Sequence, residues 1–386
     1  FNVKNKKIIL RLDLNVPLKN KIIMDDTRIL LSLPFVKELV NKKAKIIILS
    51  HLGRPKGKKD STLSLVPIYN YLKKNLQTNV YFYMGNFDDE GENEFSNLKE
   101  GEVILIENIR YFKEETDNEE NFAKKLASLG DIYINDAFSC SHREQSSIHK
   151  ITKFIDKSFA GPLLKKEIDA INLVIKNKKE PVTCIIGGSK ISTKINVITS
   201  LIEKINNLII VGAMANNFFI FKNFKVGKSL IEDNSNEIIK KIYDKADKNN
   251  CEIIIPNDCL VGTNYKGEGK NKILGQIKEN EIILDIGSNT IKKIKQIIDQ
   301  SKTVLWNGPA GYFENKNFLN GTISIAEAIS KNTGEKRLIS VVGGGDTLAA
   351  INNSKNKLSF SHLSTAGGAF LEYLEGKDLP GLSVLK

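Results

Sequence analysis

Short apolar runs recur along the chain, and most of them are continuous rather than alternating with polar residues. A continuous run is typical of a strand that is buried on both faces of a sheet. Five runs lie before residue 140 and six after residue 181, so the pattern predicts about eleven buried strands. They are KIILRLDLN, KIIILSHLGR, NVYFY, EVILIENIR, DIYINDAFS, VTCIIGGSK, NLIIVGAMAN, EIIIPND, EIILDIG, TVLWNGP and LISVVGGGDT.

Amphipathic segments such as residues 34–43 and 120–130 separate these runs. Strands that alternate with helices form βαβ units and parallel sheets. Because eleven strands are too many for one comfortable open sheet, we expect two sheets. The predicted fold class is α/β, with two doubly wound, Rossmann-like domains joined by a hinge helix.

The hinge helix is predicted within residues 161–181. Apolar residues recur there at helical spacing, and the polar stretch NKKEP ends the pattern. We therefore expect an N-terminal domain over residues 1–162, an interdomain helix and linker over 163–180, and a C-terminal domain over 181–376. The apolar positions of the helix are Leu164, Ile168, Ile171, Val174 and Ile175.

Arginine is rare in this lysine-rich chain, which has six arginines and 51 lysines among 386 residues. The planar guanidinium grips a carboxylate or phosphate bidentately, whereas lysine serves well as a solvated charge. Four arginines follow predicted strands, at the sheet edge where doubly wound domains bind ligands. Each could instead pair with a nearby carboxylate. We call the set at this edge the basic rim: Asp13, Asn15, Arg28, His51, Arg54, Arg110 and Arg143.

The net charge of +12 raises the possibility of nucleic-acid binding. The lysines, however, are spread in pairs along the whole length, as helix surfaces usually are, and base readout favours arginine. No apolar run approaches membrane-spanning length, and residues 1–17 are interrupted by charges, unlike a secretory signal. The four cysteines lack the spacing of a zinc site, so we expect free thiols in a reducing compartment.

Three glycine-rich loops lie between strands and helices of the second half. CIIGGSKISTK contains Gly188, and Lys190 and Lys194 are expected on one face of the following helix. STAGGAFLEYLEG, residues 364–376, is another such loop. Free backbone N–H groups at such junctions bind anions, so three together predict a nucleotide phosphate site. The loop in LISVVGGGDT comprises Gly343, Gly344, Gly345, Asp346 and Thr347.

Asp346 has two readings from its position at the start of a helix. It could cap the helix N-terminus through its side chain. It could instead be a hard oxygen ligand for a Mg²⁺ ion that the nucleotide carries.

Seven sequence blocks occur in order along nearly the whole chain: RLDLNVP, SHLGRP, ENIRY, GGSKISTK, WNGPAGYFE, GGGDT and HLSTAGGAFLEYLEGKDLPG. In these blocks the chain resembles the phosphoglycerate kinase family, and GGSKISTK resembles the bacterial branch. The resemblance implies reversible phosphoryl transfer from 1,3-bisphosphoglycerate to ADP, giving 3-phosphoglycerate and ATP. A basic nucleic-acid-binding protein and a dinucleotide-dependent enzyme remain the alternatives, although RLDLN is not a GxGxxG motif.

The resemblance also implies a role for each matching residue. The basic rim would bind phosphoglycerate, and Arg28 and Lys190 would be catalytic. Glu314 would hold the ribose, and Asp346 would hold Mg²⁺. The remaining nucleotide-binding residues would be Gly188, Lys190, Lys194, Asn307, Gly343, Gly344, Gly345 and Thr347.

Further expectations follow from the resemblance. Residues 377–386 would pack back on the first domain, and the domains would close to bring the substrates in line. The partners would be small molecules only, with neither nucleic acid nor membrane, and the chain would act as a monomer in the cytoplasm, with an organelle left open. The chain departs from the family pattern at two positions. Glu144 stands beside Arg143, where the family usually has a small residue. Ala366 stands where the family has a glycine, and alanine is strained there if the position requires a positive φ.

Overall fold

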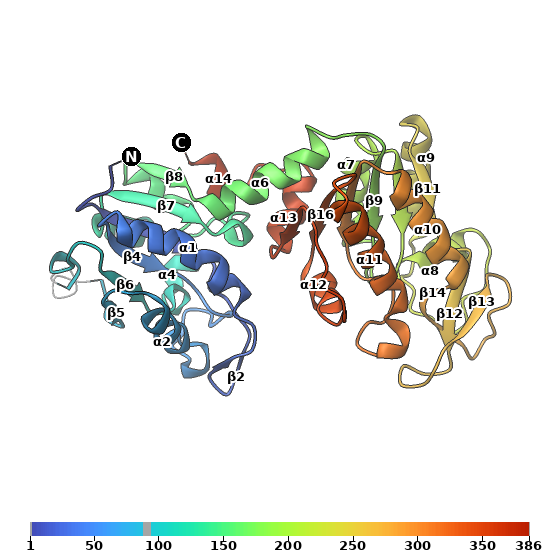
Figure 1. Cartoon of the computed structure of the whole chain (residues 1–386), viewed down its shortest axis with the longest axis horizontal. Coiled ribbons are helices and arrows are strands. Elements are labelled where there is room, and N and C mark those ends of the chain that lie inside the picture. Colours follow the sequence, from blue (N-terminus) through green and yellow to red (C-terminus); the bar gives the residue numbers. More distant parts are fainter. Residues whose placement is uncertain (1, 88–93, 386) are drawn as a thin grey trace. The chain divides into compact units, whose positions relative to one another are not determined.

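The structure is a computed structural model that describes residues 2–87 and 94–385. The chain divides into two compact units, which are described separately (Figure 1). The first unit runs to Glu167 and also includes the chain from Asp378 onwards, and the second is Ile168–Lys377. The division falls inside helix α6 (Pro162–Ile175), which is the helix expected near the domain break.

The first unit contains a six-stranded, wholly parallel sheet with the strand order β5-β6-β4-β1-β7-β8. A two-stranded hairpin, β2 with β3, lies outside it. The strands are β1 (Lys7–Leu12), β2 (Leu18–Lys19), β3 (Ile22–Ile23), β4 (Lys45–Leu49), β5 (Val80–Tyr83), β6 (Val103–Ile106), β7 (Ile132–Asp136) and β8 (Ser158–Ala160). The helices are α1 (Thr27–Asn41), α2 (Val66–Asn75), α4 (Lys113–Thr116), α5 (Glu120–Ser128), α14 (Pro380–Ser383) and 3₁₀ turns at Ser61–Leu63, Ile109–Tyr111, Phe138–Cys140 and Lys150–Lys153.

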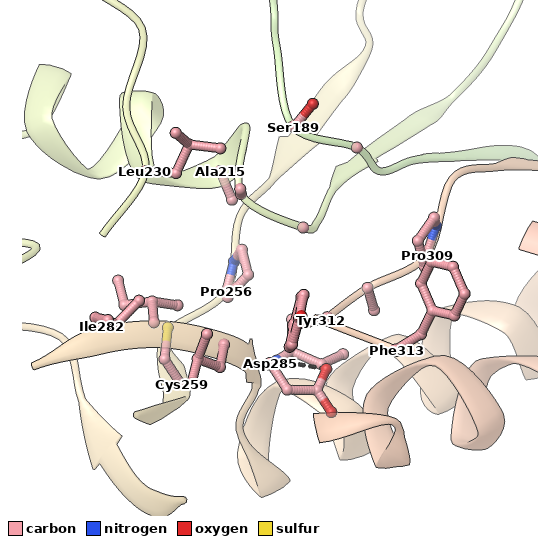
Figure 2. A pocket seen from close by; sticks show the side chains of 18 of the residues that line it. Ser189, Ala215, Leu230, Pro256, Cys259, Ile282, Asp285, Pro309, Tyr312 and Phe313 are labelled. Carbon is pink, nitrogen blue, oxygen red and sulfur yellow. Dashed lines mark hydrogen bonds between the residues drawn. The ribbon is translucent and has the colours of Figure 1, made fainter. Parts of the chain in front are cut away.

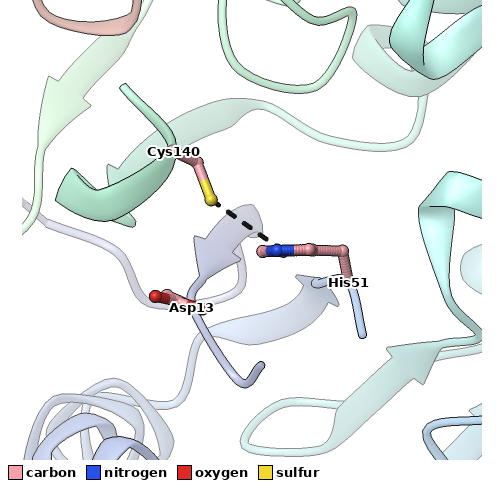
Figure 3. A group of neighbouring side chains, drawn as sticks. All are labelled: Asp13, His51 and Cys140. Carbon is pink, nitrogen blue, oxygen red and sulfur yellow. Dashed lines mark hydrogen bonds between the residues drawn. The ribbon is translucent and has the colours of Figure 1, made fainter. Parts of the chain in front are cut away.

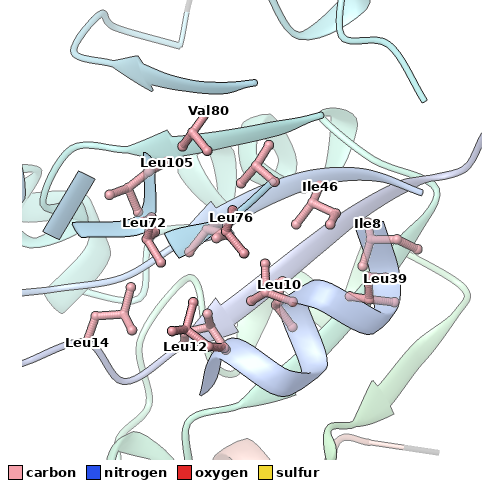
Figure 4. Close-up of a cluster of buried hydrophobic side chains, with 14 of the residues drawn as sticks. Ile8, Leu10, Leu12, Leu14, Leu39, Ile46, Leu72, Leu76, Val80 and Leu105 are labelled. Carbon is pink, nitrogen blue, oxygen red and sulfur yellow. The ribbon is translucent and has the colours of Figure 1, made fainter. Parts of the chain in front are cut away.

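Strand β1 shows why its apolar run is continuous. Ile8 and Leu10 pack with residues of α1 and α2 on one face of the sheet (Figure 4). Ile9 packs with residues of α5 on the other face. Because both faces are covered, alternate residues of the strand are buried in different cores. Arg11 is fully buried in this strand, at a position where an apolar residue would be expected.

The second unit has a six-stranded parallel sheet, β11-β10-β9-β15-β16-β17, and a three-stranded antiparallel sheet, β13-β12-β14. The strands are β9 (Val182–Ile186), β10 (Asn207–Ile210), β11 (Glu252–Ile254), β12 (Asp258–Gly262), β13 (Lys270–Ile273), β14 (Ile282–Ile286), β15 (Thr303–Asn307), β16 (Ile339–Gly343) and β17 (His362–Ser364). The helices are α7 (Ile195–Ile202), α8 (Ala215–Phe221), α9 (Asn236–Lys248), α10 (Ser288–Gln300), α11 (Asn320–Gly334), α12 (Gly345–Ile351), α13 (Gly368–Leu374) and a 3₁₀ turn at Lys316–Phe318.

The predicted fold class, with its parallel sheets, is confirmed, and all eleven apolar runs contain strands. One placement was wrong: EIILDIG forms β14, which pairs antiparallel with β12 in the small sheet. The strand is still largely buried, so its composition resembles that of a parallel strand. Strands β8 and β17 were not expected, because each has only three residues.

The last residues of the chain contact the first unit. Gly381 N donates to the carbonyl of Ser141 at 2.8 Å, and Asn135 Nδ2 donates to the carbonyl of Gly381 at 2.9 Å. A side chain at position 381 would meet Ile148 and Ser141, so only glycine fits this close approach.

All four cysteines are free, as expected, and all four are buried. None of the helices within residues 2–87 and 94–385 combines the length and hydropathy that a bilayer crossing requires.

Candidate active site

The basic rim of the first unit is built on the loops that follow β1 and β4. Asp13 Oδ2 accepts a hydrogen bond from Arg28 Nη1 at 2.7 Å and another from the Ser139 hydroxyl. Arg28 Nη1 also donates to the carbonyl of Asn15 at 3.1 Å. Arg28 therefore does pair with a carboxylate. The pair is partly open to solvent, so the guanidinium is held in place while part of it remains accessible.

A second set of hydrogen bonds fixes the loop after β4. Asn15 Oδ1 accepts from Gly53 N at 2.9 Å, and Arg110 Nη1 donates to the carbonyl of Gly53 at 3.0 Å. Gly53 has φ +59°, which a glycine adopts without strain. Arg54 follows directly and is exposed. The two hydrogen bonds to Gly53 therefore fix the backbone from which the exposed Arg54 side chain extends.

Arg110 is buried but retains unused donor capacity. Its Nη2 donates to Gln145 Oε1 at 3.3 Å, whereas its Nε has no hydrogen-bond partner in the described part of the chain. Burial lowers the pKa of this guanidinium. A buried, incompletely satisfied arginine is stabilised by an anion, which supplies both charge and acceptors.

His51 is buried near the arginines of the first unit. Burial lowers the pKa of its imidazole well below the usual value, and the charges of Arg11, Arg110, Arg28 and Arg143 lower it further. The ring is therefore neutral near pH 7. Arg143 itself is exposed, and its charge acts on the His51 ring.

Asp13, His51 and Cys140 place their ligand atoms within 4.8 Å of one another (Figure 3). This grouping resembles a metal site, but two of the three ligand atoms already contact guanidinium groups. His51 Nδ1 faces Arg11 Nη2 at 3.1 Å, and Asp13 accepts from Arg28. Two guanidinium cations at these atoms repel a metal ion, so the geometry favours an anionic ligand instead.

The second unit contains a cavity of about 270 Å³. Its walls are mostly apolar and include Pro256, Pro309 and Tyr312, as Figure 2 shows. Three predicted nucleotide-site residues, Gly188, Glu314 and Asp346, also line it. Asp285 is a third carboxylate in the lining. An apolar cavity bordered by a glycine loop and carboxylates matches the needs of a flat ring that carries polar groups.

Asn307, at the end of β15, joins two of the glycine loops. Its Oδ1 accepts from Lys194 Nζ at 2.7 Å, and its Nδ2 donates to the carbonyl of Gly343 at 2.9 Å. Gly344 has φ +105° and lies so close to Asn307 that a side chain would collide with the amide. Thr347 Oγ1 accepts from Gly308 N at 2.7 Å, which ties the loop from Gly343 to Thr347 to the turn after β15 a second time.

The lysines of GGSKISTK differ from the prediction. Helix α7 begins only at Ile195, so Lys190 and Lys194 do not share a helical face. Lys194 folds back over the loop and reaches the carbonyl of Gly187, and burial lowers its pKa to about 8. Lys190 is exposed on the turn before α7.

The capping reading of Asp346 is excluded by the local geometry. The N-cap of α12 is Gly344, and no side chain caps this helix. Asp346 lies exposed in the first turn and lines the cavity, and its negative charge raises the pKa of Lys194, against the larger effect of burial.

The structure describes the surroundings of the two departures. Ala366 is buried and is not among the residues with positive φ, so alanine is not strained there. The charge of Glu144 acts on His149, whose pKa it raises against the larger lowering effect of burial.

Sequence reasoning missed Arg11, Gln145 and the apolar cavity wall. Gln145 and the wall residues have no distinctive pattern. The rarity of arginine did mark Arg11, but its place inside a strand hid its link to His51.

The structure thus has two parallel-sheet α/β units, one with a cluster of arginines beside His51 and one with an apolar cavity. The chain belongs to the phosphoglycerate kinase family: the model of that family, "Phosphoglycerate kinase", matches residues 1–377. This finding does not favour the nucleic-acid-binding and dinucleotide-dependent alternatives.

Individual relatives agree with the family match. A phosphoglycerate kinase from Wolbachia pipientis subsp. Culex pipiens (strain wPip) is 46% identical, over 98% of this chain and 96% of the relative. One from Buchnera aphidicola subsp. Schizaphis graminum (strain Sg) is 45% identical, over 100% and 97%. The structure of phosphoglycerate kinase from Coxiella burnetii matches with a TM-score of 0.88 at 36% identity, over 100% of this chain and 97% of that one.

Proposed function

We propose that this chain catalyses reversible phosphoryl transfer from 1,3-bisphosphoglycerate to ADP, giving 3-phosphoglycerate and ATP. The observation that carries the proposal is the pairing of two different sites in a chain of this family. One unit has a cationic, hydrogen-bonded anion site, and the other has an apolar cavity with glycine loops. Phosphoryl transfer needs such positioning and charge stabilisation, and it needs no protein nucleophile.

The first unit, including the tail from Asp378, would be the phosphoglycerate-binding domain. Arg54, Arg110 and Arg143 would bind the carboxylate and phosphate of the substrate, and His51 would donate one hydrogen bond. Arg28, held by Asp13, would neutralise the phosphoryl group during transfer. The buried, incompletely satisfied Arg110 supports this assignment most strongly.

The second unit would be the nucleotide-binding domain. The apolar cavity would hold the base, Glu314 the ribose hydroxyls, and the loop from Gly343 to Thr347 the phosphates. Lys190 and Lys194 would neutralise phosphate charge. Asp346 would hold the Mg²⁺ of the nucleotide, and this exposed carboxylate at the cavity edge is a suitable hard oxygen ligand that would leave the other positions to phosphate and water.

Because the two sites lie on different units, transfer would require the domains to close about helix α6. Closure would bring the ADP oxygen in line with the acyl phosphate and exclude water. We further propose that the chain acts as a monomer in the cytoplasm. Four free, buried thiols support a reducing compartment.

A coupled assay tests the function. MgATP and 3-phosphoglycerate should together give turnover, read as reduction of the 1,3-bisphosphoglycerate that forms, and omission of either substrate should abolish it. Arg337→Lys serves as the control for the arginine variants, because within the described residues the Arg337 side chain lies in an exposed ion pair with Glu335. Absence of turnover in the intact, folded chain would overturn the proposal.

A further inference from the structure

Arg11 is the one arginine of the first unit without a place in the proposed substrate contacts, and it is fully buried. All three of its nitrogens are engaged. Nε donates to Ser147 Oγ at 3.1 Å, Nη1 donates to the carbonyl of Leu12, and Nη2 contacts His51 Nδ1 at 3.1 Å. Nη2 also donates to Cys140 Sγ at 3.8 Å. Partners in three directions require a planar fork, which lysine does not possess.

The far side of this fork is anchored by a buried carboxylate. Ser147 Oγ donates to Glu115 Oε1 at 2.6 Å, and Ser147 N donates to Glu115 Oε2 at 2.8 Å. Glu115 is fully buried, and the charge of Arg11 opposes the rise that burial causes in its pKa. A hydroxyl group can donate one hydrogen bond while accepting another, so Ser147 joins carboxylate and guanidinium directly.

The contact with Arg11 determines which nitrogen of His51 carries the proton. A guanidinium has donors only, so His51 Nδ1 must accept and therefore carries no proton. In a neutral imidazole the proton then resides on Nε2, which becomes a donor. The charged and titratable groups around the ring are Arg11, Arg28, Arg110, Arg143, Asp13 and Cys140.

We propose that Arg11 is a positioning residue of the phosphoglycerate site: it holds His51 in the Nε2–H tautomer, which presents an N–H donor to the anionic substrate. Only the identity of this acceptor rests on the proposed function. Glu115 and Ser147 keep the guanidinium in register, and Arg11 itself touches no substrate. The low pKa of His51 agrees with a ring that stays neutral when the site is empty.

The test is NMR of the full chain labelled with ¹⁵N in histidine, combined with steady-state kinetics. The chain has four histidines, and His51→Gln identifies the signals of His51. We expect Nδ1 unprotonated and Nε2 protonated in the parent from pH 6 to 8. In Arg11→Met the His51 signals should show a second tautomer or a titration.

The same variant should raise KM for 3-phosphoglycerate about tenfold, the loss of one hydrogen bond to a charged group, and leave KM for MgADP unchanged. Arg337→Met is the matched control and should change neither spectrum nor KM. At any given pH the signals of His149, whose Nδ1 contacts Asn118 Nδ2, should be the same in the parent and in both variants, and they serve as an internal reference.

Unchanged His51 signals in folded Arg11→Met would overturn the proposal, whatever happens to KM. Should that variant fail to fold, the parent spectrum still decides, because a protonated Nδ1 or a ring that titrates between pH 6 and 8 contradicts it. The ring signals do not depend on turnover. A chain without kinase activity would therefore refute the proposed function and leave the tautomer measurable.

Discussion

Lys194 offers a sharp test of the nucleotide-binding cavity, because burial has already shifted its proton equilibrium. Its ammonium donates to Asn307 Oδ1 and to the carbonyl of Gly187, and burial lowers its pKa from 10.5 to about 8. Near pH 8 the side chain is therefore about half protonated. We predict that an anionic nucleotide restores the proton, since a nearby negative charge favours the ammonium form.

The size of the effect follows from the pKa. If bound phosphate returns the pKa towards 10.5, each nucleotide takes up about 0.5 proton at pH 8 and about 0.1 at pH 7. Titration calorimetry of MgADP in two buffers of different ionisation enthalpy measures this number. Lys194→Met should bind MgADP with no proton uptake at either pH. Equal uptake in the parent and in Lys194→Met, or none in the parent at pH 8, would refute the reasoning.

The same residue makes a prediction for stability. Holding the charged ammonium at pH 7 against a pKa of about 8, rather than 10.5, costs about 3 kcal/mol. This cost already includes the hydrogen bonds that the ammonium makes. Lys194→Met removes the cost but leaves Asn307 Oδ1 without its lysine donor, which costs about 1–3 kcal/mol. Lys194→Met should thus be slightly more stable than the parent at pH 7. Because the pKa of Lys194 is lower in the folded state than in the unfolded state, the parent gains stability as pH rises from 8 towards 10.5. The stability advantage of Lys194→Met over the parent should therefore disappear in this range.

Three further predictions concern other residues. Arg54→Lys should mainly raise KM for 3-phosphoglycerate, whereas Arg28→Lys should mainly lower kcat, by about 10²-fold or somewhat less, because Arg28 meets the phosphoryl group only during transfer. Steady-state kinetics, with Arg337→Lys as the control, test both effects. A Lys variant that matches the parent in kcat and KM would show that the guanidinium is not needed at that position. Asp346→Asn should lose most activity with little change in Tm, as no cap is lost; earlier unfolding with normal kcat would contradict a role as metal ligand. Asp285 accepts hydrogen bonds from Gly321 N and Ile286 N, and burial raises its pKa from 3.8 to about 7. Between pH 3.8 and about 7 the folded state therefore keeps a proton that the unfolded state has lost, and the parent loses stability as pH rises. In denaturant unfolding, the free energy of unfolding of Asp285→Asn should rise relative to that of the parent from pH 5 to 8. A difference that stays constant over this range would contradict the raised pKa.

The sequence predicted the two parallel sheets because buried strands must be apolar on both faces. The ends of the strands were also the basis for predicting the basic rim, since parallel strands present their carboxyl ends at one edge. The antiparallel pairing of β14 was beyond this reasoning, because a buried antiparallel strand can have the same composition.

The contacts within the sites depended on tertiary structure. The turn before α7 places Lys194 against Asn307, which lies 113 residues away in the sequence. The link from Glu115 through Ser147 and Arg11 to His51 joins four segments that no local pattern connects. Residue type indicated charge and hydrogen-bonding capacity, and the fold determined which partner each group found.

The central claim is direct transfer of the phosphoryl group between substrates, with no protein nucleophile. Rapid-quench analysis of 1,3-bisphosphoglycerate labelled in the transferred group, mixed with the protein and MgADP, tests it most directly. The account predicts that label passes from 1,3-bisphosphoglycerate to ATP at least as fast as kcat, with none on the denatured protein. Label that appears first on the protein, for example on the His51 imidazole, and then moves to ADP at a competent rate would contradict it.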